Sequence, residues 1–235
     1  MKLMVAGLVV FSGVVTATPA FAQTAPATGT DVYHVHFAKA APGQAAALGK
    51  SLMEPDKTSP MPTHFVVLRH QEGDDWDYVV IQHLGPKAEV TATAPAQTDA
   101  QRALNAWHND TFVSGPSWAD FTREMGIGGS ANAASQVYIV GVHRPVPGHR
   151  EQLLKSLSAP GAASKIQTGN VLLAHIEGSE WTFATITRYN SWQDVAGDRV
   201  ATASAGTATA GGWADIRQHS GFHRDTIADR IYPPK

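Results

Sequence analysis

The chain has no cysteine among its 235 residues. This absence excludes disulfide scaffolds, lipid-modified lipoproteins, thiolate metal sites and cysteine nucleophiles. Neither sign of charge is in excess, since 18 Lys and Arg stand against 20 Asp and Glu, and no run of Lys and Arg is longer than two residues. Nucleic-acid binders normally carry a basic patch, so we expect no nucleic-acid partner.

Long apolar runs are also missing, apart from one at the N-terminus. Leu3–Val15 follows Met1-Lys2 and precedes Ala20-Phe21-Ala22, which is the layout of a secretory signal peptide over residues 1–22. The run is too short to span a bilayer as an anchor. We therefore expect cleavage after Ala22, a flexible leader over residues 23–30, and a periplasmic or secreted protein without a membrane anchor.

Several motifs that would name a reaction are absent as well. The sequence has no G-x-S-x-G, no P-loop and no dinucleotide-binding fingerprint. Fold and compartment can thus be predicted more sharply than chemistry.

What the chain does contain is an internal repeat at an offset of 105 residues. The correspondence runs from residue 32 to residue 90 and fades beyond it. It predicts a duplication, with repeat 1 over 31–125, a Gly-, Ser- and Ala-rich linker over 126–135 and repeat 2 over 136–235. Corresponding segments include Val32-Tyr33 and Val137-Tyr138, Pro42-Gly43 and Pro147-Gly148, Lys50-Ser51-Leu52 and Lys155-Ser156-Leu157, and Glu72-Gly73 and Glu177-Gly178.

Each repeat has the pattern β-α-β-β-α-β of a ferredoxin-like unit. Such a sheet carries its helices on one face and leaves the other face bare. Two copies in one chain can bury each other's bare face, so we predict an α+β fold in which two tandem ferredoxin-like repeats form an intrachain pseudo-dimeric α+β barrel. The expected strands are 32–37, 63–70, 76–83 and 118–125, then 137–142, 170–175, 181–188 and 223–232; the expected helices are 44–53 and 101–108, then 149–158 and 213–218.

This pattern resembles the dimeric α+β barrel superfamily, which includes antibiotic-biosynthesis monooxygenase-like, NIPSNAP-like and stress-responsive A/B barrel proteins. The motifs that carry the resemblance are Tyr33, Pro42-Gly43 and Trp76, repeated as Tyr138, Pro147-Gly148 and Trp181. The resemblance implies a small-molecule site, because members include cofactor-independent oxygenases, haem-binding and haem-degrading enzymes, lyases and isomerases. No catalytic set of any one of these families can be placed on this sequence.

Two histidines of the first expected strand are candidate catalytic residues. His34 and His36 are two positions apart, so both side chains lie on one face of the strand. The second repeat has Ile139 and Gly141 in their places. This asymmetry indicates a site in one half, where a neutral imidazole acts as general acid or base. The alternative is a partly solvated face without function.

A second set of histidines indicates a metal. His219 and His223 have the i,i+4 spacing that puts two imidazoles on one face of a helix. An antiparallel closing strand would bring His143 toward His223. His143, His219 and His223 would then offer three nitrogen ligands to zinc, iron or copper. The alternative is a capped helix end with surface histidines, because Gly221 interrupts the helix.

Three classes of function follow. The first is an exported barrel that binds a small molecule as a cofactor-independent oxygenase or lyase-type enzyme, with His34 and His36 catalytic and Tyr33, Arg69 and Gln82 binding the ligand. The second is a haem- or metal-binding protein, and the third a non-catalytic interaction module. The expected partners are a small-molecule ligand and, in a homo-oligomer, further copies of the chain. The first class requires no cofactor; haem or a divalent metal belongs to the second.

Overall fold

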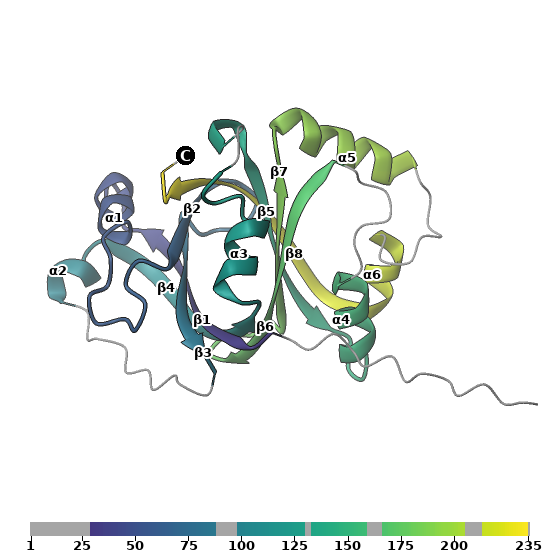
Figure 1. Ribbon diagram of the computed structural model, residues 1–235, viewed down its shortest axis with the longest axis horizontal. Coiled ribbons are helices and arrows are strands. Elements are labelled where there is room, and N and C mark those ends of the chain that lie inside the picture. The colour runs from purple at the N-terminus through teal and green to yellow at the C-terminus, as the bar shows by residue number, and fades with distance from the viewer. Residues whose placement is uncertain (1–28, 88–97, 130–132, 159–165, 205–212, 235) are drawn as a thin grey trace, which may run out of the picture.

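In the part of the chain that the structure describes, eight antiparallel strands close into one barrel, accompanied by six α-helices (Figure 1). The computed structural model describes residues 29–87, 98–129, 133–158, 166–204 and 213–234. None of the helices within these ranges is long and apolar enough to cross a membrane. The predicted signal peptide lies outside the described residues, as does the leader up to residue 28. In chain order the elements are β1 (Asp31–Ala40), α1 (Ala45–Leu52), β2 (Phe65–Glu72), β3 (Tyr78–Pro86), α2 (Asp99–Arg102), β4 (Asn105–Gly115), α3 (Trp118–Glu124), β5 (Val137–Pro145), α4 (Arg150–Ser158), β6 (Gln167–Glu177), β7 (Phe183–Tyr189), α5 (Trp192–Ser204), α6 (Trp213–His219) and β8 (Ser220–Tyr232).

The strand order around the barrel is β1-β3-β2-β8-β5-β7-β6-β4. The first half of the chain contributes β4-β1-β3-β2 and the second half contributes β8-β5-β7-β6. The halves join through β2 against β8 and β4 against β6. The predicted α+β barrel is therefore confirmed, and each half contributes a four-stranded sheet to it.

The barrel interior is a packed hydrophobic core. In β1 the residues Tyr33, Val35 and Phe37 point inward and are at most 7% exposed, while His34 and His36 alternate to the outer face. Burial of each large side chain contributes about 1.5–3 kcal/mol to folding. The largest cluster draws on both halves, so neither sheet keeps a bare face; it consists of Tyr33, Val35, Phe37, Val66, Leu68, Trp76, Val79, Ile81, Val113, Phe121, Met125, Tyr138, Val140, Val171, Leu173, Trp181, Ala184, Ile186 and Ala228.

The helices cover the outer faces of the two sheets on opposite sides of the barrel. Helices α1 and α2 lie on one side, and α4, α5 and α6 lie on the other (Figure 1). In the second half, Val195 of α5 packs on Val137, Ile139 and Tyr189. The outer layer over β5 is therefore apolar at the position where β1 has a histidine.

The two halves also interlock through their β-hairpin turns. A Cβ on Gly178 would lie 2.3 Å from the carbonyl oxygen of Asp110, and a Cβ on Gly73 would lie 2.5 Å from that of Asp225. Both glycines have a positive φ, +114° and +127° respectively. Each turn thus needs glycine for its conformation and for its close approach to a strand of the other half.

Two expected elements of the first half are wrong. The helix predicted over 101–108 is limited to α2, and the chain continues from Asn105 as strand β4. The strand predicted over 118–125 is helix α3. A sequence signal for α3 exists, because Ser117 is an N-cap whose Oγ accepts from the backbone N–H of Asp120 at 3.2 Å. The hydroxyl of Ser117 in turn donates to the Asp120 carboxylate.

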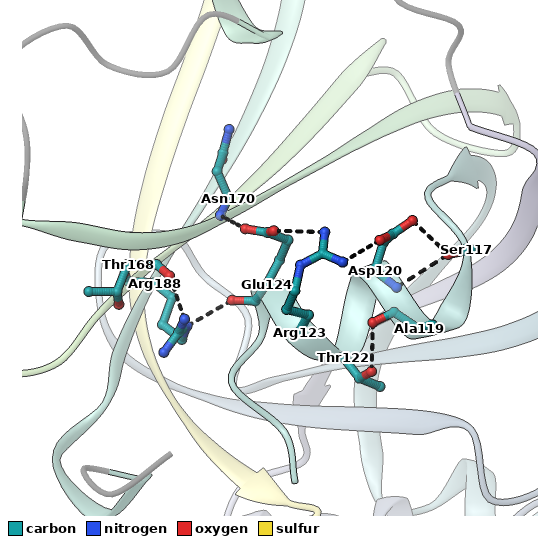
Figure 2. A network of polar contacts seen from close by, with 9 residues as sticks. All are labelled: Ser117, Ala119, Asp120, Thr122, Arg123, Glu124, Thr168, Asn170 and Arg188. Carbon is teal, nitrogen blue, oxygen red and sulfur yellow. Dashed lines mark hydrogen bonds and ion pairs between the residues drawn. The ribbon is translucent and has the colours of Figure 1, made fainter. Parts of the chain in front are cut away.

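Helix α3 ties the first half to the second (Figure 2). The backbone carbonyl of Glu124 accepts from Arg188 Nε at 2.7 Å, and the Glu124 carboxylate accepts from the backbone N–H of Asn170 at 3.1 Å. Phe121 and Met125 point into the barrel core. Helix α3 therefore contributes both apolar side chains to the barrel core and hydrogen bonds to the second half.

The offset between the halves changes along the chain. Each residue of β1 corresponds to the residue of β5 that lies 105 positions later. The residues of β4 that pair with β1 correspond to residues of β8 that lie 115 positions later, as the pairs His36↔Asp110 and Gly141↔Asp225 show. The additional ten residues lie before β8, in the part of the chain that contains α5, which the sequence did not predict. An offset of 105 residues consequently no longer aligns equivalent residues of the two halves beyond residue 90.

Candidate active site

Four polar side chains and one aromatic ring gather on the outer face of β1 and β4. The antiparallel register pairs His34 with Phe112, His36 with Asp110 and Ala38 with His108. Because alternate residues share a face, all of these side chains point away from the packed interior. The two histidines predicted as catalytic are thus placed together, beside His108 and Asp110.

Asp110 is the centre of this group. Its Oδ1 lies 2.8 Å from His34 Nε2 and 2.8 Å from His36 Nδ1, while its Oδ2 lies 2.7 Å from His108 Nδ1. The His36 ring is 5.3 Å from the His108 ring, and the His34 ring is 5.2 Å from that of Phe112. We call His34, His36, His108 and Asp110 the Asp110 cluster.

The electrostatics of the Asp110 cluster define its protonation. Burial raises the pKa of the Asp110 carboxyl, but the hydrogen bonds from His34 and His36 outweigh that effect, and the pKa lies well below its usual range. An ionised carboxylate only accepts hydrogen bonds, so each facing imidazole nitrogen carries the proton. In the neutral ring the opposite nitrogen then has a free lone pair: Nδ1 of His34, and Nε2 of His36 and of His108.

The cluster is accessible from outside. The side chains of Asp110 and His108 are 39% exposed, and that of His34 is 27% exposed. In the second half the position of His34 is taken by Ile139, which is buried beneath α5. Access to the outer face of β1 and burial of the outer face of β5 therefore distinguish the two halves.

The second half has a related but different group. The closing strands carry the same motif, His108-x-Asp110-Thr111 in β4 and His223-x-Asp225-Thr226 in β8. His223 Nε2 lies 2.8 Å from Asp225 Oδ1, and Arg199 of α5 contacts the other carboxylate oxygen at 3.4 Å.

The predicted metal ligands are only partly brought together. His143 and His223 stack with ring centroids 4.6 Å apart, as the expected antiparallel pairing requires. His219 does not join them, because it ends α6 and its Nδ1 lies 2.9 Å from Nδ1 of His149. Within the described residues, the set of three side chains that places ligand atoms within 4.8 Å of one another is His36, His108 and Asp110. The His143, His219 and His223 set does not form.

The three predicted ligand-binding residues lie apart from one another. Tyr33 is fully buried in the barrel and donates its hydroxyl to the Pro116 carbonyl at 2.7 Å, so it is a core residue. Gln82 is 8% exposed, and its amide donates to the carbonyls of Met61, His64 and His83, which positions a loop.

Arg69 lies on the opposite edge of its sheet, where β2 meets β8. Its guanidinium donates to Asp229 through Nε at 3.1 Å and through a terminal nitrogen at 3.0 Å. The two residues line a shallow depression together with Gln71, Ser135, Ser191 and Trp192. This depression does not include the Asp110 cluster.

Sequence reasoning missed His108 and Asp110. Their signal was the His-x-Asp-Thr motif common to β4 and β8, which appears only when the closing strands are aligned at an offset of 115 rather than 105. The two motifs can be matched only when the strand register shows which residues of β4 and β8 are equivalent.

Comparison with known proteins finds a similar fold but no related sequence. No protein-family model matches the chain, and no curated protein matches it either. A solved structure described as an anthrone oxidase-like protein superposes with a TM-score of 0.58 and 12% identity, over 86% of this chain and 92% of that one. A protein from Lactobacillus acidophilus NCFM, provisionally described as a monooxygenase, gives a TM-score of 0.46 and 10% identity, over 86% and 94% of the two chains. At this identity, the first likeness shows a shared fold and nothing about activity.

Proposed function

We propose that this protein is an enzyme that removes a proton from an acidic small molecule at the Asp110 cluster. The observation that carries the proposal is that one ionised carboxylate fixes three imidazoles on the accessible outer face of β1 and β4. A carboxylate that holds one ring nitrogen sets the tautomer and stabilises the imidazolium that forms when the other nitrogen takes a proton. His34 and His36 are the bases, and Asp110 orients them.

The reaction class we favour is cofactor-independent oxygenation, with a lyase reaction as the alternative that uses the same base. Loss of an acidic proton gives an electron-rich carbanion or phenolate, and such an anion can reduce molecular oxygen without a cofactor. An anthrone is a suitable first probe, because the neighbour of similar fold is described as anthrone oxidase-like. In that reaction the methylene carbon becomes a carbonyl: one oxygen atom of O₂ enters the product, and the other leaves as water with the two hydrogens.

The test is oxygen consumption with anthrone and with a panel of acidic phenols and 1,3-dicarbonyls, followed by product analysis. Asp110→Asn should lower kcat/KM by about 10²–10⁴-fold, because it removes the negative charge and one of the two acceptor oxygens that hold the rings. Asp225→Asn alters the equivalent residue of the second half and should leave the rate unchanged. Equal rates for both variants, or a wild-type protein that neither consumes oxygen nor cleaves any panel member, would show that the enzyme assignment is wrong.

We further propose that the two halves descend from one duplicated ferredoxin-like unit. The equal strand order of the two sheets and the His-x-Asp-Thr motif of both closing strands support this origin. After duplication, one half kept an accessible cluster, while Ile139 and Gly141 replaced its histidines in the other.

Export also belongs to the proposal, on the basis of residues 1–22. Expression of the full chain in a bacterium, followed by fractionation and N-terminal sequencing, tests it. Mature protein that begins at Gln23 outside the cytoplasm is the expected result; full-length protein retained in the cytoplasm contradicts it.

A further inference from the structure

Three side chains of the Asp110 cluster have the composition and spacing of a transition-metal site. We infer that His36, His108 and Asp110 bind a divalent first-row transition-metal ion. Their ligand atoms all lie within 4.8 Å of one another. The inference goes beyond the proposed function, because the cofactor-independent reaction needs no ion, and the binding of the ion does not depend on that function.

The distances already suit coordination. With metal–ligand bonds of about 2.0–2.2 Å, neighbouring ligands are about 3 Å apart in an octahedral arrangement. His36 Nδ1 lies 2.8 Å from Asp110 Oδ1, and His108 Nδ1 lies 2.7 Å from Oδ2. Binding therefore requires small side-chain shifts and a change of tautomer, in which the protons of His36 and His108 move from Nδ1 to Nε2. The backbone of β1 and β4 stays in place.

The donor types decide which ions fit. Two imidazoles and one carboxylate favour Fe²⁺, Co²⁺, Ni²⁺, Cu²⁺ and Zn²⁺, whereas Mg²⁺ and Ca²⁺ prefer ligand sets made of oxygen alone. Three protein ligands leave coordination positions open, which is the property of a catalytic rather than a structural site. The 39% exposure of both His108 and Asp110 leaves room for an oxygen atom of the substrate at such a position.

His34 has a separate part in this site. Its Nε2 donates to Asp110 Oδ1 at 2.8 Å, so it holds the carboxylate without itself belonging to the set of three. Hydrogen bonds of this kind orient a ligand and typically change metal affinity by about 10–100-fold. His34 is thus a positioning residue for the metal, and its Nδ1 stays available as a base. His36 cannot act as a base while it binds the ion, because its Nδ1 is then a ligand and its Nε2 carries the proton.

The second half provides a matched control. Its His223 and Asp225 repeat His108 and Asp110, but Gly141 stands where His36 stands in the first half, and Arg199 contacts the carboxylate. His143 stacks on His223, but within the described residues it does not form with His223 and Asp225 a set whose ligand atoms all lie within 4.8 Å, so a metal that needs three ligands should not bind there.

The experiment is a titration of tag-free, chelator-treated protein with Co²⁺, followed by visible absorption and by calorimetry. One Co²⁺ per chain with a d–d absorption band is expected for the wild type. His108→Ala and Asp110→Asn should weaken binding by at least about 100-fold, and His34→Ala by about 10-fold with an altered spectrum. His223→Ala and Asp225→Asn should bind as the wild type does. Circular dichroism of each variant confirms that it is folded.

Two results would overturn the inference: a wild-type protein that binds no Co²⁺ or Zn²⁺ at millimolar concentration, or equal affinities for His108→Ala and His223→Ala. The oxygen assay with chelated protein separates this outcome from the proposed function. Turnover without metal binding leaves the acid–base function standing and removes the ion. Metal binding without turnover of any panel member keeps the metal site and removes the proposed acid–base function.

Discussion

Acidification should destabilise this protein through one buried histidine, His143 of β5. His143 is 3% exposed to solvent, and its Nδ1 has no hydrogen-bond partner. Burial and the neighbouring His223 lower the pKa of His143 from its ordinary value of 6.5 to about 4. A protonated ring would carry two N–H groups; Nε2 lies 3.3 Å from the hydroxyl oxygen of Thr185, and the nearby Asp225 carboxylate offsets only part of the effect of burial.

The sign and size follow from the difference between the folded and unfolded chains. Well above pH 6.5 the ring is neutral in both states, so His143 does not make stability depend on pH. As the pH falls from about 6.5 toward about 4, the unfolded chain takes up a proton that the folded chain refuses, so stability is lost throughout that interval. Between about pH 7 and about pH 5 the loss from this residue is about 2 kcal/mol, and below pH 4 it reaches about 3 kcal/mol.

The assay is urea unfolding at a series of pH values for the wild type and for His143→Phe, which keeps an aromatic ring on His223 but cannot titrate. The variant should lose about 2 kcal/mol less than the wild type between about pH 7 and about pH 5. NMR titration of the His143 ring in the folded wild type provides a second measurement that needs no variant. Parallel stability curves, or a His143 ring that titrates near 6.5, would refute the reasoning.

Two further predictions concern how the halves are joined. Gly178→Ala and Gly73→Ala should each destabilise the barrel by about 1–3 kcal/mol, because each alanine would have a positive φ and meet a carbonyl of the other half. Only Gly178→Ala presses on the backbone of Asp110, so it should weaken Co²⁺ binding while Gly73→Ala does not; equal affinities would contradict the link between that turn and the site. Tyr138→Phe should cost about 1–2 kcal/mol in thermal or urea unfolding, because its buried hydroxyl donates to the Met125 carbonyl at 2.8 Å and accepts from Arg230 Nε. An unchanged unfolding midpoint would show that these groups find other partners.

The fold was largely predictable from local patterns. The alternation of Tyr33, Val35 and Phe37 with His34 and His36 identified β1 and its two faces, and the repeat identified the matching strand β5. Pro-Gly steps followed by leucines at helical spacing indicated α1 and α4. These signals are local, since they depend on residues close together in the chain.

The wrong predictions concern two segments whose secondary structure depends on contacts with residues far away in the sequence. The segment Asn105–His108 was predicted as helix, but its backbone pairs with β1, and this long-range pairing makes it a strand. The segment after Ser117 becomes a helix because Phe121 and Met125 pack in the barrel core and Glu124 forms hydrogen bonds with the second half.

The sequence by itself predicted the barrel, the common face of His34 and His36, and the absence of both histidines from the corresponding positions of the second half. Only the tertiary structure decided that Asp110 and His108 complete the cluster. Asp110 lies 74 residues beyond His36, and the register between their strands depends on the length of the connection, which differs by ten residues between the halves. Alternation fixes the face on which a side chain lies; the partner opposite it is fixed by long-range pairing, which no local pattern encodes.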